Sequence, residues 1–205
     1  MLGIAVFVPD QEMYGQVEEI LKANQDVVVI VDEAYVDFAG PSALELLDKY
    51  ENLLVVQTFS KSRSMAGMRI GFAMGHPDLI RALNDVKYSY NSYTMNLPSL
   101  LAGVEAVKDK EYFEKTIEKI VATREHAKKR LTELGFTFPN SQSNFIFASH
   151  KSVPAEKIFE ALKKEQIYVR YFKTPGLDNS LRISIGTDEE MDTLFRFLEA
   201  YLPNA

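Results

Sequence analysis

Two short runs of apolar residues stand out in the first half of the chain, at 27–31 and 53–57. The first, Val-Val-Val-Ile-Val, lacks the alternation of apolar and polar residues that marks a strand with one face in water. A β-branched run of this kind predicts a strand buried on both faces, as in a parallel sheet covered by helices. Further strands are predicted at 3–8 and 70–74, and helices at 11–23, 42–50 and 77–86. This order is typical of a doubly wound α/β sheet.

The second half of the chain has a long amphipathic helix followed by shorter elements. Apolar residues at spacings of three, four and seven predict a helix over 111–134, which Gly135 ends. Thr187 and Glu190 form a capping box, T-x-x-E, which predicts the start of the last helix, running to about residue 201. The remaining predicted elements are a helix from about 97, a helix at 155–165, and strands at 144–148, 167–172 and 181–185.

These patterns predict two domains. We expect residues 1–105 to carry the doubly wound part, and residues 106–205 to form a small α+β domain with helices on one side of its sheet. A helix as long as 111–134 can bridge two such domains.

Composition narrows the classes of protein and of site. The net charge of −6 argues against a nucleic-acid-binding surface, and the absence of cysteine excludes disulfides and thiolate metal sites. His76, His126 and His150 have no ligand spacing, so we expect no metal site and only capping or surface roles for them. The first residues lack the features of a signal peptide, and no apolar run approaches the roughly 18 residues that span a bilayer. We therefore expect a cytoplasmic protein without a membrane segment.

A polar stretch rich in hydroxyls and positive charge follows the strand at 53–57. It reads Thr-Phe-Ser-Lys-Ser-Arg-Ser from 58 to 64, and Lys61 stands just past the end of a buried strand. A lysine there needs a partner for its ammonium, and the hydroxyls with Arg63 and Arg69 suit a phosphate. A phosphate beside a lysine nucleophile indicates pyridoxal phosphate, whose aldehyde forms a Schiff base with an amine. The alternative is a solvated polar loop with ordinary salt bridges.

Asp32 and Tyr35 follow the strand at 27–31 and add to this pattern. Pyridoxal phosphate needs a carboxylate at its pyridine nitrogen and a donor at its ring oxygen, besides the lysine and the phosphate donors. Neighbouring strands lie about 4.8 Å apart, so side chains at the ends of both strands can converge with Lys61 on one ring. Taken singly, Asp32 fits a solvated turn and Tyr35 a partly buried aromatic residue.

Four segments, in order along the chain, resemble the fold-type I aminotransferases: DEAYVDF, TFSKSRSMAGMRIGFA, SNFIFA and LRISIGT. Within these the chain most closely resembles the histidinol-phosphate aminotransferases, over essentially its whole length. The resemblance implies the α/β PLP-transferase (aspartate aminotransferase-like) fold. Residues 1–105 would then be the C-terminal part of the large, pyridoxal-phosphate-binding domain, a remnant of its doubly wound sheet, and 106–205 the small C-terminal domain.

The resemblance also implies roles for single residues. Lys61 would be the catalytic Schiff-base lysine, with Asp32 at the pyridine nitrogen of pyridoxal 5'-phosphate and Tyr35 at its ring oxygen. Arg63 receives no role and is expected to be a surface or structural residue. The residues that would bind the cofactor phosphate are Ser60 and Arg69, with Thr58 nearby.

The implied substrates are small molecules with negative charge. Arg170 and Arg182 would receive the phosphate of histidinol phosphate, or of imidazole acetol phosphate, and in turn a carboxylate of glutamate or 2-oxoglutarate. Asn144 is expected to touch substrate as well. The resemblance thus implies amino transfer in histidine biosynthesis by a homodimer. For each arginine, the alternative is an edge-strand residue with its charge in water.

The chain departs from this family at its front. Complete members are longer there and carry an Asn-Pro-x-x-Pro-Thr-Gly segment that this sequence lacks, so we expect a cofactor site open on one face. Such a chain would be a truncated product, a fragment, or a remnant with another role. An aminotransferase for aromatic amino acids, a phospho-amino-acid decarboxylase and a non-catalytic binding module remain as alternative functions.

Overall fold

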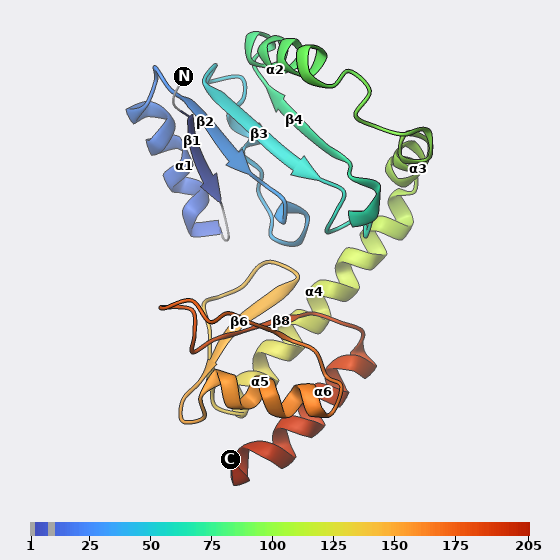
Figure 1. Ribbon diagram of the computed structural model, residues 1–205. Helices are drawn as coiled ribbons and strands as arrows, with labels where there is room; N and C mark the ends of the chain where they lie inside the picture. The colour runs from blue at the N-terminus through green and yellow to red at the C-terminus, as the bar shows by residue number, and fades with distance from the viewer. Residues whose placement is uncertain (1–2, 8–10) are drawn as a thin grey trace. The chain divides into compact units, whose positions relative to one another are not determined.

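The structure is a computed structural model that describes the backbone of residues 3–7 and 11–205 and the side chains of residues 15–205. It divides into two compact units, Met1–Lys115 and Thr116–Ala205, and helix α4 (Lys110–Glu133) has residues in both (Figure 1). The units divide later than residue 105 because α3 (Leu97–Lys108) packs on the first unit. Ser99 of this helix donates to the carbonyl of Met68 at 2.7 Å.

The first unit is built on a four-stranded sheet in the order β1-β2-β3-β4 (Figure 1). Its strands are β1 (Gly3–Phe7), β2 (Val28–Asp32), β3 (Leu53–Thr58) and β4 (Gly71–Gly75), close to the four predicted places. The first three strands are parallel, and α1 (Gln11–Ala23) connects β1 to β2. β4 is antiparallel to β3, because a loop without a crossover helix connects the two strands.

The other helical segments of this unit differ in part from the prediction. The helix predicted at 42–50 is only a 3-10 turn, η2 (Ala43–Leu46), because the chain must turn back into β3 at Leu53. Conversely, α2 (Pro77–Tyr90) extends past residue 86, since no helix-breaking residue precedes Asn91. Two further 3-10 turns are η1 (Val36–Phe38) and η3 (Ala66–Met68).

One face of β2 is more deeply buried than the other. Val29 and Val31 are fully buried, whereas Val28 and Ile30 on the other face are half-buried. The prediction that this strand is buried on both faces is therefore wrong for the described chain, because α1 and η2 cover only one face. The residues of this core are Val17, Leu21, Val29, Val31, Ala43, Leu46, Leu53 and Val55.

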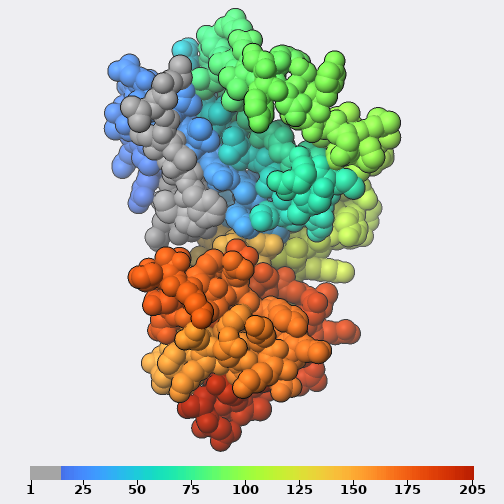
Figure 2. Space-filling view, in the orientation of Figure 1, coloured from blue at the N-terminus to red at the C-terminus, as the bar shows by residue number. Residues whose placement is uncertain are grey.

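Apolar side chains also remain in water on the segment from α2 through α3, green to yellow-green in Figure 2. On α3 they recur at helical spacing and form one exposed stripe, which we call the α3 stripe. Its residues are Leu97, Leu100, Leu101, Val104 and Val107, each about half exposed or more. Apolar surfaces of this kind are common at interfaces between polypeptides.

The second unit is an antiparallel sheet in the order β5-β6-β8-β7. Its strands are β5 (Phe136–Thr137), β6 (Phe145–His150), β7 (Arg170–Tyr171) and β8 (Leu181–Ser184). Its helical segments besides α4 are α5 (Ala155–Lys164), α6 (Asp188–Tyr201) and the 3-10 turn η4 (Leu202–Asn204). The sequence predicted every strand except β5, whose two residues are too few to give a pattern.

Helices cover one face of this second sheet, as predicted for an α+β unit. Ile146 and Ala148 of β6 and Ile183 of β8 point into the core, where they meet buried residues of α4, α5 and α6. The alternate side chains of these strands, among them Phe145 and Arg182, therefore lie on the opposite face. In the described ranges 3–7 and 11–205, none of the helices has both the length and the hydrophobicity to cross a membrane.

Glu33, directly after β2, is a buried carboxylate that joins three segments of the first unit. It is only 6% exposed and accepts hydrogen bonds from Ser42 Oγ and the Ala43 N–H, each at 2.6 Å, and from Gln57 Nε2 at 2.9 Å. These bonds connect the turn after β2 to η2 and to β3. Buried charge is tolerated only with such partners, so Glu33 fixes the backbone on which Asp32 and Tyr35 stand.

We expect Glu33→Ala to lower the free energy of unfolding by about 2–4 kcal/mol, because it removes three hydrogen bonds to a buried carboxylate, one of them from the buried N–H of Ala43. Urea denaturation followed by circular dichroism measures this change. The control is Glu45→Ala, which removes an exposed carboxylate of η2 and should change stability by less than about 0.5 kcal/mol. Equal effects of the two substitutions would contradict a structural role for Glu33.

Candidate functional site

Two of the predicted cofactor residues lie at the carboxyl end of β2. Asp32 is the last residue of this strand, in register with Val56 of the neighbouring strand β3. Its Oδ1 accepts the N–H of Ala34 at 3.0 Å, an Asx turn that orients the half-buried carboxylate. Tyr35 precedes η1 and is half-buried. Both side chains therefore stand at the sheet edge where open α/β folds bind ligands.

Lys61 lies in the loop that follows β3, and the structure brings it to Tyr35. Its Nζ is 5.4 Å from the centroid of the Tyr35 ring, a distance within the range of cation–π attraction. The lysine is half-buried and forms no ion pair with any carboxylate of residues 15–205. A lysine amine held over an aromatic ring beside the ends of two parallel strands is available for chemistry.

The hydroxyls of Thr58 and Ser60 lie 2.9 Å apart at the start of this loop. Thr58 Oγ1 also donates to the carbonyl of Ile70 at 3.2 Å and accepts the N–H of Ser60 at 3.1 Å. The Thr58 hydroxyl is thus used within the loop itself, which joins the end of β3 to the start of β4. The Ser60 hydroxyl has fewer such bonds and is the better candidate to contact a ligand.

Arg69 directly precedes Ile70, whose carbonyl accepts hydrogen bonds from Thr58 Oγ1 and the Phe59 N–H. Its side chain is exposed, and Nη1 donates to the carbonyl of Ala66 in its own loop at 2.9 Å. Its backbone has φ 55° and ψ 41°, the left-handed region that residues other than glycine rarely adopt. The exposed Arg69 side chain forms no hydrogen bond with the side chain of Lys61 or Ser60.

Two residues that the sequence did not single out hold this region together. Ser62, next to Lys61, is 3% exposed and donates to Asp37 Oδ2 at 2.5 Å, which ties the lysine loop to η1. The second is Glu33, described above. One signal of its burial was present in the sequence: Gln57 is a polar residue within an otherwise apolar strand, where it needs a buried partner.

The predicted substrate residues lie in the second unit. Arg170 and Arg182 are direct partners in the antiparallel pair of β7 and β8, so their side chains project from the same face of the sheet. Arg170 Cζ lies 5.4 Å from the centroid of the Phe172 ring, and Arg182 Cζ lies 5.3 Å from that of Phe145.

The two guanidinium groups lack a counter-charge among the described side chains. Neither forms an ion pair with a carboxylate of residues 15–205, and Arg182 Nε is buried without any hydrogen-bond partner there. Like charges directly opposite one another are unfavourable. A bound anion would relieve both the repulsion and the unpaired donor. Asn144 is half-buried at the start of β6, and its carbonyl accepts the N–H of Ile185 at 2.9 Å.

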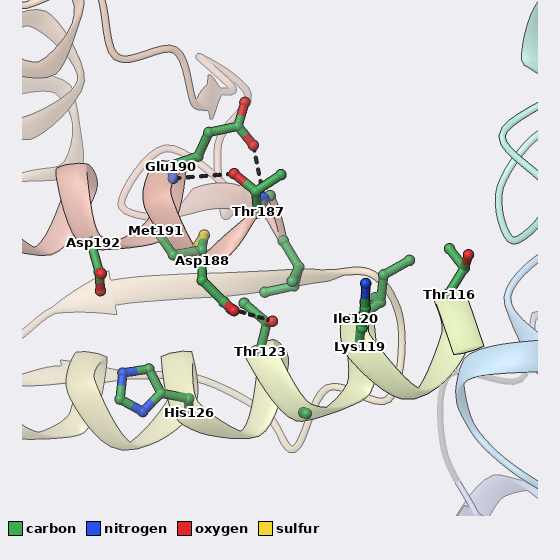
Figure 3. Close-up of a pocket in the computed structure, with 13 residues that line it drawn as sticks. Thr116, Lys119, Ile120, Thr123, His126, Thr187, Asp188, Glu190, Met191 and Asp192 are labelled. Carbon is green, nitrogen blue, oxygen red and sulfur yellow. Dashed lines mark hydrogen bonds between the residues drawn. The ribbon is translucent and has the colours of Figure 1, made fainter. Parts of the chain in front are cut away.

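A cavity of about 920 Å³ in the second unit holds none of the predicted site residues (Figure 3). It lies between α4 and the start of α6, where Thr123 donates to Asp188 at 2.7 Å. The capping box of Thr187 and Glu190 forms there as predicted, so these polar groups serve helix structure. His126 is exposed at this cavity, and within residues 15–205 no group of three potential metal ligands is found.

We expect Ser62 and Asp37 to be coupled in stability. A double-mutant cycle with Ser62→Ala, Asp37→Ala and the double variant should give a coupling free energy of about 1 kcal/mol, because the bond joins a hydroxyl to a carboxylate. Urea denaturation of the four proteins measures it. A cycle of Ser62→Ala with Asp48→Ala, an exposed acid of the same unit, should give none. Zero coupling in the first cycle would show that the bond does not hold the loop.

Comparison with known proteins adds to this geometry. The model of the family "Aminotransferase class I and II" matches residues 8–198. The "Histidinol-phosphate aminotransferase" of Brachyspira hyodysenteriae is 53% identical over 190 residues, which are 92% of this chain and 54% of that protein. The chain thus spans about half the length of the curated relatives it matches.

Solved structures agree on the fold. A histidinol-phosphate aminotransferase from Clostridium acetobutylicum gives a TM-score of 0.88 at 23% identity, covering 99% of this chain and 64% of that one. A second, from Sinorhizobium meliloti in complex with pyridoxal-5'-phosphate, gives 0.80 at 25% identity, covering 98% and 56%. The two sheets are thus a partial form of the fold-type I architecture, as predicted. Because the family model covers most of its length, the chain belongs to the aminotransferase class I and II family.

Proposed function

We propose that this chain is part of a pyridoxal-phosphate-dependent aminotransferase that transfers an amino group between histidinol phosphate and 2-oxoglutarate. The observation that carries the proposal is Lys61, a half-buried lysine beside Tyr35 with no carboxylate partner among residues 15–205. The names of the similar proteins support the choice of substrate. Because the chain spans about half their length, turnover by this chain alone is itself a proposal.

The residues present fit the proposed cofactor in chemistry. Asp32 Oδ2 accepts no hydrogen bond from residues 15–205, so one carboxylate oxygen is left to receive a protonated ring nitrogen. Lys61 supplies an amine, and the hydroxyls of Tyr35 and Ser60 supply donors near it. Arg69 adds positive charge at the rim of the same loop, which suits a phosphate.

When bound, pyridoxal phosphate supplies an aldehyde that condenses with amines and a ring that withdraws electrons from the substrate's Cα. In our proposal Lys61 holds that aldehyde and later removes and returns the proton at Cα. Asp32 keeps the ring nitrogen protonated, and Tyr35 donates to the ring oxygen. Ser60 and Arg69 orient the phosphate, with Thr58 shaping the turn between them.

We further propose that Arg170 and Arg182 hold the charged end of the substrate. Two guanidinium groups on one sheet face suit a phosphate and a carboxylate in turn, since both ligands accept paired hydrogen bonds. The histidinol-phosphate and glutamate half-reactions would use the same two arginines. Asn144 directly precedes β6, the strand next to β8, and is proposed to contact the same ligands.

The remaining proposals concern assembly and location. We propose a homodimer, in which a second copy covers the α3 stripe. Small charged metabolites as substrates suit a cytoplasmic enzyme. An aromatic aminotransferase or a phospho-amino-acid decarboxylase would need the same cofactor residues, so assays with each substrate must separate them. A non-catalytic remnant would keep the fold without reacting with the cofactor.

We expect pyridoxal phosphate to react with Lys61. Treating the mixture with borohydride should leave a stable pyridoxyl group on the peptide that contains Lys61, detected by mass spectrometry, together with a change in visible absorption. Lys61→Ala should lose both signals, whereas Lys49→Ala, at an exposed lysine of the same unit, should keep them. An unlabelled Lys61 in the unaltered chain would favour the non-catalytic remnant.

We expect Arg182→Ala to weaken the binding of inorganic phosphate and of glutarate by about tenfold, since each loses a bidentate charged contact. Arg182→Lys should recover only part of the loss, because an ammonium lacks the guanidinium fork. Isothermal titration calorimetry gives the dissociation constants. Arg196→Ala, an exposed arginine of α6, is the control and should bind normally. Unchanged binding in Arg182→Ala would remove the substrate role from this residue.

A further inference from the structure

The loop that carries Lys61 contains backbone strain that must be offset by its surroundings. Ser64 has φ 54° and Arg69 has φ 55°, both in the left-handed region. Such residues cost about 1 kcal/mol or more each and persist only where other contacts fix them. The loop between β3 and β4 has hydrogen bonds of its own, among them the Ser64 N–H to the carbonyl of Lys61 at 3.1 Å, and it also contacts other elements.

On one side the loop is held by Ser62, which donates to Asp37 in η1. That bond joins the residue after Lys61 to the segment that begins at Tyr35. Ser99 of α3 holds the far end of the loop, where its Oγ donates to the carbonyl of Met68 at 2.7 Å. A second contact beside Lys61 would fix the lysine end of the loop from another direction.

Arg63 makes that second contact. Its Nη1 donates to the carbonyl of Ala106 at 2.5 Å, in the last turn of α3. Its Cζ lies 4.0 Å from the ring centroid of Phe113, in the first turn of α4, and 5.2 Å from that of Phe59 at the end of β3. The guanidinium therefore touches three elements at once, and all of them belong to the first unit.

The chemistry of these partners explains why an arginine is suited to the position. Carbonyl groups in the last turn of a helix lack donors within the helix and carry partial negative charge, which a cation stabilises. A planar guanidinium can stack on an aromatic ring while its edge donates a hydrogen bond. Arg63 does both, on α3 and on Phe113. In the described chain, none of these contacts of Arg63 is to Lys61 or to another proposed cofactor residue.

We propose that Arg63 is a positioning residue that fixes the lysine loop against α3 and α4, and so keeps the amine of Lys61 beside Tyr35. Ser62 and Arg63 are adjacent in sequence and bind opposite partners, η1 on one side and the α3–α4 junction on the other. Lys61 directly precedes this pair of contacts. The link between this arrangement and cofactor binding rests on the proposed function. The contacts that fix the loop do not depend on that function.

The test uses Arg63→Ala and Arg63→Lys in the full chain, with Arg81→Ala as the matched control. Arg81 is an exposed arginine of α2 in the same unit, and among residues 15–205 it forms an ion pair with Asp78 alone. The first measurement is amide hydrogen exchange of peptides covering 59–69, with 144–150 in the second unit as internal reference. The second is the pyridoxal phosphate concentration that half-labels Lys61 in the borohydride experiment.

We expect Arg63→Ala to speed exchange in 59–69, with 144–150 unchanged, and to raise the half-labelling concentration about tenfold. Arg63→Lys should recover part of both, because it keeps the charge and one donor, and Arg81→Ala should match the unaltered chain. Thermal melts by circular dichroism identify a variant that fails to fold; Arg63→Lys then carries the test, with an intermediate effect expected.

The outcomes separate the two proposals. Unchanged exchange in 59–69 in a folded Arg63 variant overturns the positioning role, whatever the labelling shows. Faster exchange with unchanged labelling also overturns it, because the loop would then not govern Lys61. Absence of labelling in the unaltered chain overturns the proposed function alone, and the exchange result still decides whether Arg63 fixes the loop.

Discussion

The first unit depends on one buried carboxylate whose two oxygens both accept hydrogen bonds. Glu33 receives donors from η2 and from β3, so the turn after β2 has a defined path. Asp32 and Tyr35 lie on either side of Glu33 in the sequence, so the hydrogen bonds of Glu33 also fix their positions. The parallel pairing of β2 with β3 then brings the lysine loop to the same edge. A structural acid thus lies directly beside the acid proposed for chemistry, and burial distinguishes the two roles.

The same division between supporting and reacting groups recurs along the lysine loop. The side chains of Thr58, Ser62 and Arg63 form hydrogen bonds with other protein groups, whereas Lys61 Nζ forms none with residues 15–205 and the Ser60 hydroxyl forms fewer. The second unit follows the same logic. Its helices bury one sheet face, and the opposite face presents Arg170 and Arg182 without a counter-charge in the described chain.

The sequence was most informative where the signal is local. The apolar runs placed the strands, and the capping box of Thr187 placed the start of α6. The approach of Lys61 to Tyr35 followed from strand order. The sequence could not show the partners of Glu33 and Ser62, which lie nine to 25 positions away, because such pairs leave no periodic trace. It also overestimated burial of β2, since a continuous apolar run does not reveal whether the chain at hand covers both faces.

The backbone of Arg69 has a consequence for how this loop can change. Glycine would adopt the left-handed conformation there at no steric cost, and asparagine at little. For an arginine at this place, the bond from its guanidinium to the carbonyl of Ala66 offsets part of this cost. The substitution Arg69→Gly would separate the backbone conformation from the positive charge. The main chain would keep the left-handed conformation without strain, so the loop would keep its shape, while its electrostatic attraction for anions would decline.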